Sequence, residues 1–383
     1  MSSPHDSPAV ASEPYHNRLA EVARLFLRLG VTAFGGPAAH IALMEDETVA
    51  RRKWLTREQF LDLLGIANLL PGPSSSEVAI YLGFKRAGWR GLILAGVCFI
   101  LPAALLATLI AWAYLRFGSL PHAAGVLYGI RPVVVAIALQ AIWRLGRTAL
   151  KTITLAVIVI CTAGFSLIGV GPVWLLLLSG SVMLLIQQAG RIRTRLSAFS
   201  FAALPAAGSA LSISLTSLFL VFLKLGFVVF GSGYVLLAFL RADLVVRLHW
   251  LTEKQLLDAV AVGQFTPGPV FTTATFIGYL LAGAKGAAIA TVAIFFPAFI
   301  LVAVTGPFVS CLRRSPAIAA ILDGVNAGSL GLMAAVTLFL GRAAILDIPA
   351  GVIAVVAAFL LFRLRINSTW LILAGAAAGY FLK

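Results

Sequence analysis

The chain has 383 residues, of which 61% are hydrophobic and only 11% are charged, and its formal net charge is +15. A soluble domain carries about 25% charged residues, so this chain has too few to cover a water-facing surface. The basic residues lie in short clusters between apolar runs, a pattern that indicates membrane topology rather than nucleic-acid binding. The composition predicts an integral membrane protein in a lipid bilayer.

The first 18 residues lack the basic and apolar regions of a signal peptide and are expected to form a disordered tail. Two transporter halves follow, at 19–195 and 211–383, joined by a linker at 196–210. Most of their apolar runs approach the ~20 residues that cross roughly 30 Å of hydrocarbon. The runs are 92–115, 123–143, 153–170, 173–186, 287–309, 317–340, 348–362 and 370–382. The expected fold is an all-α polytopic membrane protein.

The two halves repeat one another. The segment 26–73 recurs as 222–269 at a constant offset of 196 residues, and both copies contain Trp-Leu-Thr followed by Pro-Gly-Pro. Beyond the second motif the offset becomes 195, so that Pro102 corresponds to Pro297. A duplicated apolar chain with Gly and Pro interruptions is typical of secondary transporters, which bind their substrate where the copies meet.

Basic clusters at 51–57 and 85–90 flank the first Pro-Gly-Pro, so both loops are expected on the cytoplasmic side. The stretch between them then forms a re-entrant hairpin of two half-helices, 59–70 and 74–84, because proline breaks the helix. One crossing, over 19–44, is expected before this hairpin, and four after it. An odd number of crossings in the first half inverts the second half, which predicts two inverted-topology repeats of about five transmembrane helices each. A split hairpin or a fused pair of helices would change the number of crossings by one or two.

The Pro-Gly-Pro motifs are the candidate substrate-binding site. Each one opens a half-helix whose first turn has free N–H groups and roughly half a positive charge, which suits an anion. A simple kink in a packed helix is the alternative. The glycine-rich breaks before the hairpins either form a second wall of the site or allow close helix packing. The candidates are Gly35, Gly36, Pro37, Pro71, Gly72, Pro73, Ser74, Ser75, Ser76, Gly231, Pro267, Gly268, Pro269 and Thr272.

Charged residues inside the apolar runs are further candidates, since charge in hydrocarbon is costly. Arg131 lies in the middle of its run and can bind two oxygens of a dianion; its counterpart in the second copy is Asn326. Arg28 and Lys224 are equivalent residues that either contact the anion or extend to the membrane interface. Glu77 is a candidate proton-coupling residue, because a carboxylate beside the anion repels it unless protonated. Alternatively, Glu77 stabilises a helix N-terminus.

Recognised motifs for ATP binding or catalysis do not occur in the sequence. The cysteines and histidines lack metal-ligand spacing, so no metal or cofactor is expected. The recurring Asp62 and Asp258 follow Thr56 and Thr252, which favours a structural role at the start of a helix. The apolar runs contain no catalytic dyad, and the sequence favours a transporter over an enzyme.

The motifs Phe34-Gly35-Gly36-Pro37, Trp54-Leu55-Thr56 and Asn68-Leu69-Leu70-Pro71-Gly72-Pro73, with Phe265-Thr266-Pro267-Gly268-Pro269, strongly resemble the two-domain chromate ion transporter family, ChrA. The resemblance covers about residues 26–297. It implies a multi-pass protein of the bacterial inner (plasma) membrane that exports chromate, a tetrahedral dianion similar in shape to sulfate, and confers chromate resistance. The second copy departs from the first motif, with Gly231-Ser232-Gly233 in place of Gly35-Gly36-Pro37.

Other functions stay open at this point. Sulfate or another oxyanion is the alternative substrate, because sequence alone does not separate two dianions of nearly equal size. A membrane enzyme or a lipid-phosphate-binding protein is the alternative class. A homodimer is a further expectation.

Overall fold

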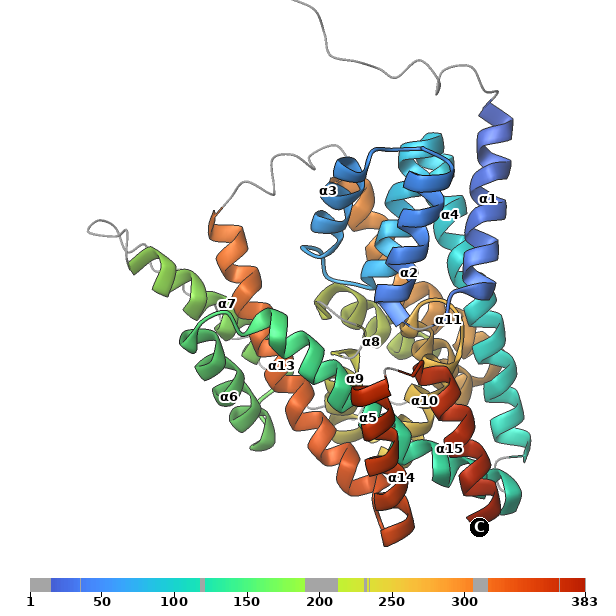
Figure 1. Cartoon of the computed structure of the whole chain (residues 1–383), viewed down its shortest axis with the longest axis vertical. Helices are drawn as coiled ribbons and strands as arrows, with labels where there is room; N and C mark the ends of the chain where they lie inside the picture. Colours follow the sequence, from blue (N-terminus) through green and yellow to red (C-terminus); the bar gives the residue numbers. More distant parts are fainter. Residues whose placement is uncertain are drawn as a thin grey trace, which may run out of the picture.

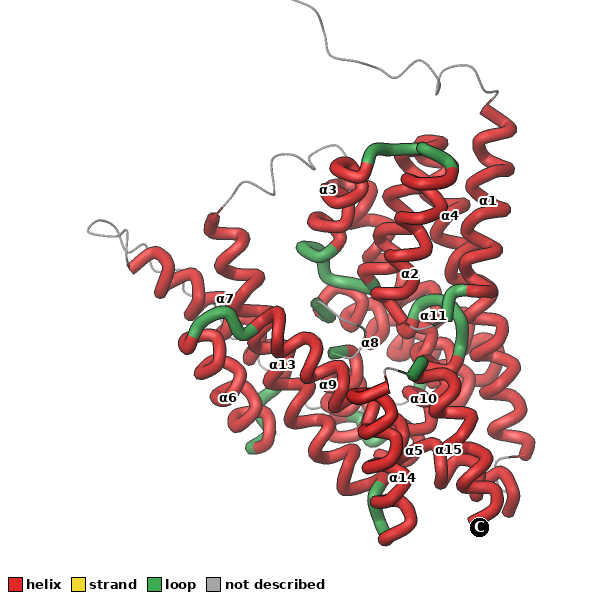
Figure 2. Tube along the Cα trace, in the orientation of Figure 1, coloured by secondary structure: helices red, strands yellow, loops and turns green. Residues whose placement is uncertain are grey.

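The structure is a computed structural model that describes residues 15–34, 36–117, 121–189, 213–230, 233, 235–305, 316–364 and 366–382. Over these residues every named element is a helix (Figures 1 and 2). The first half of the chain contains α1 (Tyr15–Thr32), α2 (Gly36–Glu45), η1 (Asp46–Arg51), α3 (Arg57–Ala67), α4 (Ser74–Phe117), α5 (Pro121–Ala149), α6 (Ile153–Leu167) and α7 (Pro172–Ala189).

The second half repeats this order of helices and has two additional short segments, η3 and η5. It contains α8 (Leu215–Val228), α9 (Leu236–Leu240), η2 (Arg241–Arg247), α10 (Glu253–Phe265), η3 (Val270–Thr272), α11 (Thr273–Thr305), α13 (Pro316–Ala344), α14 (Ile348–Phe359), η5 (Leu360–Leu364) and α15 (Ser368–Leu382). Helix α1 begins inside the expected tail at 1–18, whereas the expected linker at 196–210 lies outside the described residues.

Equivalent residues form equivalent local structures. Thr56 and Thr252 each cap a helix, α3 and α10, by accepting a hydrogen bond from the backbone of a glutamine three residues later, whose side chain bonds back to the threonine backbone. Both α4 and α11 contain a sharp break, where Gly88 has φ 60° and Gly283 has φ 62°. Side chains disfavour this conformation, so glycine lets each long helix fold back on its first turns.

Helices α4 and α11 cross in the centre of the molecule and run antiparallel. Near one end, the Tyr81 hydroxyl of α4 shares a hydrogen bond with Thr305 of α11. Near the other, the ring of Tyr114 on α4 packs 5.4 Å from that of Phe276 on α11. Helix α1 packs on α4 and α8 packs on α11, so each half buries its own helix pair, and α4 and α11 join the two halves.

The prediction of a single crossing over residues 19–44 is wrong. The Arg28 guanidinium lies 2.6 Å from the Glu47 carboxylate, and His40 lies within hydrogen-bond distance of the Ala33 carbonyl, at 3.0 Å. From residue 28 to residue 33 the contacted residue number falls from 47 to 40. The two segments are therefore antiparallel. The chain reverses at Gly36, which has φ 77°, and Pro37. Together these two residues prevent α1 from continuing.

The helices form two groups. Helices α1 to α4 pack with α8 to α11, whereas α13 packs on α6 and α7, and α5 packs on α14 and α15. Figure 1 shows α6, α7 and α13 on one side and α1 and α4 on the other. The cavity described below lies between these groups.

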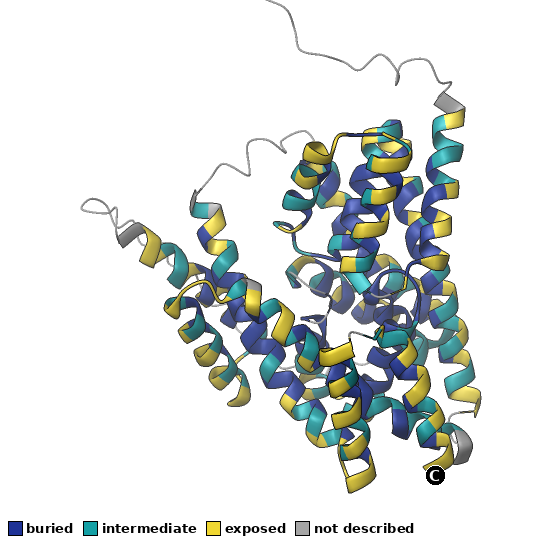
Figure 3. Cartoon of the chain, viewed as in Figure 1, coloured by how far each residue is buried: buried dark blue, intermediate teal, exposed yellow. Residues whose placement is uncertain are grey.

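The outer faces of the helices are apolar. Figure 3 shows exposed residues along the outer sides of the helices. On α4, Leu101, Leu105, Leu109 and Trp112 are exposed at a spacing of three or four residues, so they share one face. Among the residues that the structure describes, four helices are long and apolar enough to cross a membrane, at 74–117, 123–147, 270–305 and 319–344. A continuous exposed apolar stripe is suited to lipid rather than water, and the chain is a multi-pass membrane protein.

Candidate functional site

Each Pro-Gly-Pro motif is bound to the opposite half of the chain. The Gly72 N–H donates to the Val229 carbonyl at 2.8 Å, and the equivalent Gly268 N–H donates to the Ala33 carbonyl at 2.9 Å. Both glycines have positive φ, 136° and 87°. The first motif is therefore held by the segment that follows α8, and the second by the segment that follows α1.

The N-terminus of α4 carries buried polar groups that have no partner among the described residues. Ser75, Ser76 and Glu77 are buried, and Glu77 has no exposed surface at all. Within the described part of the chain, the Ser76 hydroxyl and both Glu77 oxygens have no hydrogen-bond partner. A Cβ atom on Gly72 would lie 2.6 Å from Glu77 Oε1, so this carboxylate packs directly behind the first motif. Burying polar groups unpaired is costly, and such groups mark functional sites.

The hydroxyl groups that follow the second Pro-Gly-Pro motif do have hydrogen-bond partners. The Thr272 hydroxyl donates to the Pro269 carbonyl at 2.9 Å, and the Thr273 hydroxyl donates to the Val270 carbonyl at 2.8 Å. These hydroxyls are satisfied by their own backbone, whereas that of Ser76 is not. The two copies of the motif are equivalent in sequence position but not in hydrogen bonding.

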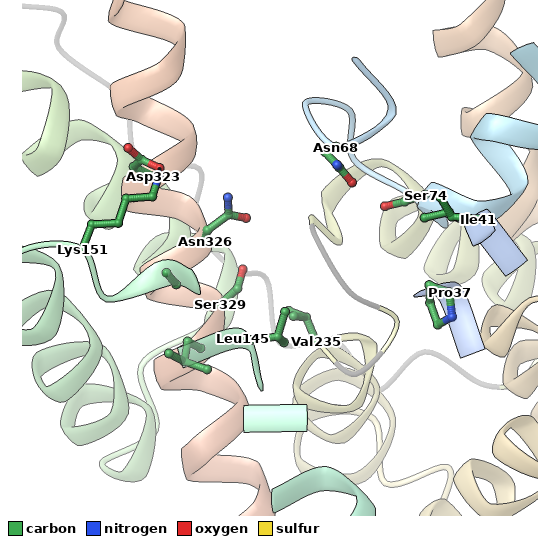
Figure 4. A pocket seen from close by; sticks show the side chains of 12 residues that line it. Pro37, Ile41, Asn68, Ser74, Leu145, Lys151, Val235, Asp323, Asn326 and Ser329 are labelled. Carbon is green, nitrogen blue, oxygen red and sulfur yellow. Dashed lines mark hydrogen bonds and ion pairs between the residues drawn. The ribbon is translucent and has the colours of Figure 1, made fainter. Parts of the chain in front are cut away.

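A cavity of about 390 Å³ opens beside the first motif (Figure 4). Asn68, which ends α3, and Ser74, which begins α4, form one wall. Asn326 and Ser329 of α13 form the opposite wall. The Ser329 hydroxyl is buried without a partner among the described residues. Amide and hydroxyl groups are neutral hydrogen-bond donors, and two facing pairs of them suit a small oxyanion.

At the edge of this cavity, the Lys151 ammonium lies 3.1 Å from the Asp323 carboxylate. Pro37 and Ile41 of α2, with Val235, contribute apolar surface. Three predicted site residues thus line one cavity, namely Pro37, Ser74 and Asn326. Gly35 and Gly231 lie outside the described residues, and Gly36 begins α2 next to Pro37.

Arg131 lies elsewhere. Its Nε and Nη2 atoms donate to the two carboxylate oxygens of Asp258 on α10, at 2.8 and 2.9 Å. The Tyr114 hydroxyl donates to the same carboxylate at 2.9 Å. Asp258 is 1% exposed. The expectation that Asp258 serves the helix start is wrong, because Thr252 caps α10 and Asp258 lies a turn and a half further on, in a buried ion pair.

Arg28 and Lys224 occupy matching ion pairs. Arg28 lies 2.6 Å from Glu47, and Lys224 lies 2.7 Å from Asp243. Each pair joins the helix before a break to the π-helical segment after it, and none of the four residues lines the cavity. The sequence contained a signal for these partners, since Glu47 and Asp243 recur at the same offset of 196 residues.

A second, more polar cavity of about 560 Å³ lies at the C-terminal end of α5. Arg144 and Arg147 line it together with Phe34 and the N-terminal end of α15. Two exposed cations beside a helix N-terminus raise the local concentration of anions.

Comparison with known proteins decides the family. The model of the chromate transporter family matches residues 20–184 and again residues 216–380. The chain belongs to the chromate transporter family. It is 34% identical to the chromate transport protein of Cupriavidus metallidurans, over 98% of this chain and 97% of that protein. It is 32% identical to the chromate transport protein of Pseudomonas aeruginosa, over 93% of this chain and 91% of that protein.

No solved structure shows significant similarity to this chromate transporter family member. The two family matches begin 196 residues apart, the same offset that the repeated motifs show. They confirm the resemblance of the motifs and extend it over nearly the whole chain. The protein is a transporter and not an enzyme.

Proposed function

We propose that this transporter exports chromate across the bacterial inner membrane and so confers chromate resistance. The observation that carries the proposal is the cavity at the N-terminus of α4, where neutral donors on two facing walls meet the positive end of a helix dipole. The names of the relatives supply the substrate, a tetrahedral dianion.

The architecture we propose is two inverted-topology repeats whose Pro-Gly-Pro hairpins are re-entrant. The antiparallel crossing of α4 and α11 and the reciprocal glycine hydrogen bonds support a pseudo-two-fold axis in the membrane plane. The basic clusters at 51–57 and 85–90 favour a cytoplasmic position for the loops that flank the first hairpin. The cavity then faces the cytoplasm, from which an exporter must take its substrate.

The proposed binding mode uses hydrogen bonds rather than a fixed counter-charge. Asn68 and Ser74 donate to oxygens on one side of the anion, and Asn326 and Ser329 donate to those on the other. Ser75 and Ser76 supply further donors from the first turn of α4. Lys151 is the cation at the cavity edge, and its charge is balanced by Asp323. A site without a permanent net charge binds the dianion weakly enough to release it on the other side.

We further propose that Glu77 couples binding to protons. Its carboxyl group lies one turn into α4, directly behind Gly72, and has no hydrogen-bond partner within the described residues. An ionised carboxylate at this position repels the dianion, whereas a protonated one donates a hydrogen bond. Export of two negative charges is in addition favoured by the membrane potential, by about 4.6 kcal/mol per 100 mV. That energy supports a gradient of roughly 2,000-fold.

Sulfate is the second candidate substrate. Donors that recognise four oxygens around a dianion bind either ion, and the cavity has no residue that distinguishes chromium from sulfur. The two substrates are separated by measuring competition.

Binding to the purified protein tests the site. We expect Ser329→Ala and Asn326→Ala to weaken chromate affinity at every pH, because each removes one donor from the α13 wall of the cavity. Thr272→Ala is the matched control, because its hydroxyl already bonds to its own backbone. Equal affinities in all three variants would place chromate outside this cavity.

A further inference from the structure

The two halves of this protein are equivalent in sequence but not in packing. In the second half, α10 packs on α5, α13 and α15. In the first half the equivalent helix, α3, packs on α4, and its end faces α13 across the cavity (Figure 4). One hairpin is therefore closed against the group of helices that contains α5 and α13, and the other stands apart from it.

The two sides differ in exposure at equivalent positions. Asn68 is exposed in the cavity, whereas its counterpart Gln264 is buried. Ser329 and Leu330 line the cavity from below the surface and are buried, as are their counterparts Val134 and Val135. Asn326, by contrast, is exposed in the cavity. The space that is open beside the first hairpin is thus closed beside the second.

The contact that closes the second side is the ion pair of Arg131 and Asp258, supported by the Tyr114 hydroxyl. It joins α5 of the first half to α10 of the second. Asn326 and Asp62 are the equivalent residues. They are apart here, because Asn326 lines the cavity while Asp62 lines a different cavity with Gln59, Leu63 and Tyr81.

We propose that Arg131 and Asp258 form an outer gate, which opens when α3 closes on α13 and Asn326 meets Asp62. In the second state, each half takes the conformation that the other half has in the first, as expected for inverted repeats. The two states are unequal in free energy. One gate is an ion pair with two parallel hydrogen bonds, whereas the other joins an amide to a carboxylate. This inequality favours the state with the cavity open, in which the structure is found.

The gate rests on the proposed transport function, but its test measures conformation without substrate. In a background that lacks Cys98, Cys161 and Cys311, one cysteine is placed at Gln264→Cys, on the closed side. A second variant carries Asn68→Cys, at the equivalent position in the cavity. A membrane-impermeant maleimide is applied from each side of oriented vesicles, and the labelling rates are compared.

We expect the cysteine at 68 to label and the cysteine at 264 to be protected. Asp258→Asn should raise labelling at 264 by at least about tenfold and lower it at 68, because removing one partner of a buried ion pair strongly destabilises the closed state. Asp62→Asn is the matched control and should leave 264 protected. Exchanging the two charges, with Arg131→Asp and Asp258→Arg together, should restore protection.

The gate is refuted if residue 264 stays protected in Asp258→Asn at normal expression, or if Asp62→Asn exposes it equally. If Asp258→Asn does not accumulate, Tyr114→Phe removes a single hydrogen bond and should give a smaller increase at 264, and no increase would also refute the gate. A protein that shows these shifts but does not move chromate would contradict the proposed function and leave the gate intact.

Discussion

Replacing Gly72 by alanine tests whether the first Pro-Gly-Pro motif shapes the anion site. Gly72 has φ 136°, a conformation in which a side chain costs about 1–3 kcal/mol. The new Cβ atom would also lie 2.6 Å from Glu77 Oε1. The carboxylate must then move by roughly 0.7 Å to reach an ordinary carbon–oxygen contact of about 3.3 Å. We expect both lower stability and a change at the site.

Gly169→Ala separates these two effects. Gly169 has φ 94°, but its Cβ atom would meet nothing within 4 Å, so alanine adds backbone strain without a clash. The measurements are thermal unfolding in detergent and the initial rate of chromate transport over a range of concentrations. Both variants should unfold at a lower temperature, and only Gly72→Ala should lose transport. If Gly72→Ala transports as well as Gly169→Ala does, the motif does not shape the site.

Three further predictions concern coupling, the gate and topology. Glu77→Gln should bind chromate well and lose the pH dependence of export. If its export rate, measured against pH at fixed potential, keeps the wild-type profile, Glu77 has no part in coupling. Arg131→Lys should slow transport despite keeping the charge, because an ammonium does not reproduce two parallel contacts with Asp258; an unchanged rate would argue against the geometry of this pair. Glu58 and Lys254 are equivalent exposed positions. A cysteine at 58 should label from the cytoplasm and a cysteine at 254 from outside, and labelling of both from one side would contradict inverted repeats.

Much of the local structure was predictable from the sequence. The two Pro-Gly-Pro motifs separate helices, and Thr56 and Thr252 cap the helices before them, because proline and N-cap chemistry act over a few residues. The reversal after α1 was not predicted. A glycine-proline break shows where a helix ends, but the direction of the next helix depends on contacts such as that of Arg28 with Glu47.

The arrangement of the site was less predictable. Arg131 was expected to face the anion, but it binds Asp258, a residue 127 positions away, and no local pattern encodes such a pair. The difference between the halves was also hidden, since a shared motif does not tell which copy is closed. The unpartnered Ser76 in one copy and the satisfied Thr272 in the other appear only in three dimensions.

Export of chromate is the central claim, and everted membrane vesicles test it most directly. In these vesicles the cytoplasmic face points outward, so an exporter accumulates radiolabelled chromate inside. We predict potential-dependent accumulation by the wild-type protein, a lower rate in Ser329→Ala and an unchanged rate in Thr272→Ala. Unlabelled chromate should compete, and the strength of competition by sulfate ranks the two dianions. Absence of accumulation in everted vesicles, with uptake in right-side-out vesicles instead, would contradict export.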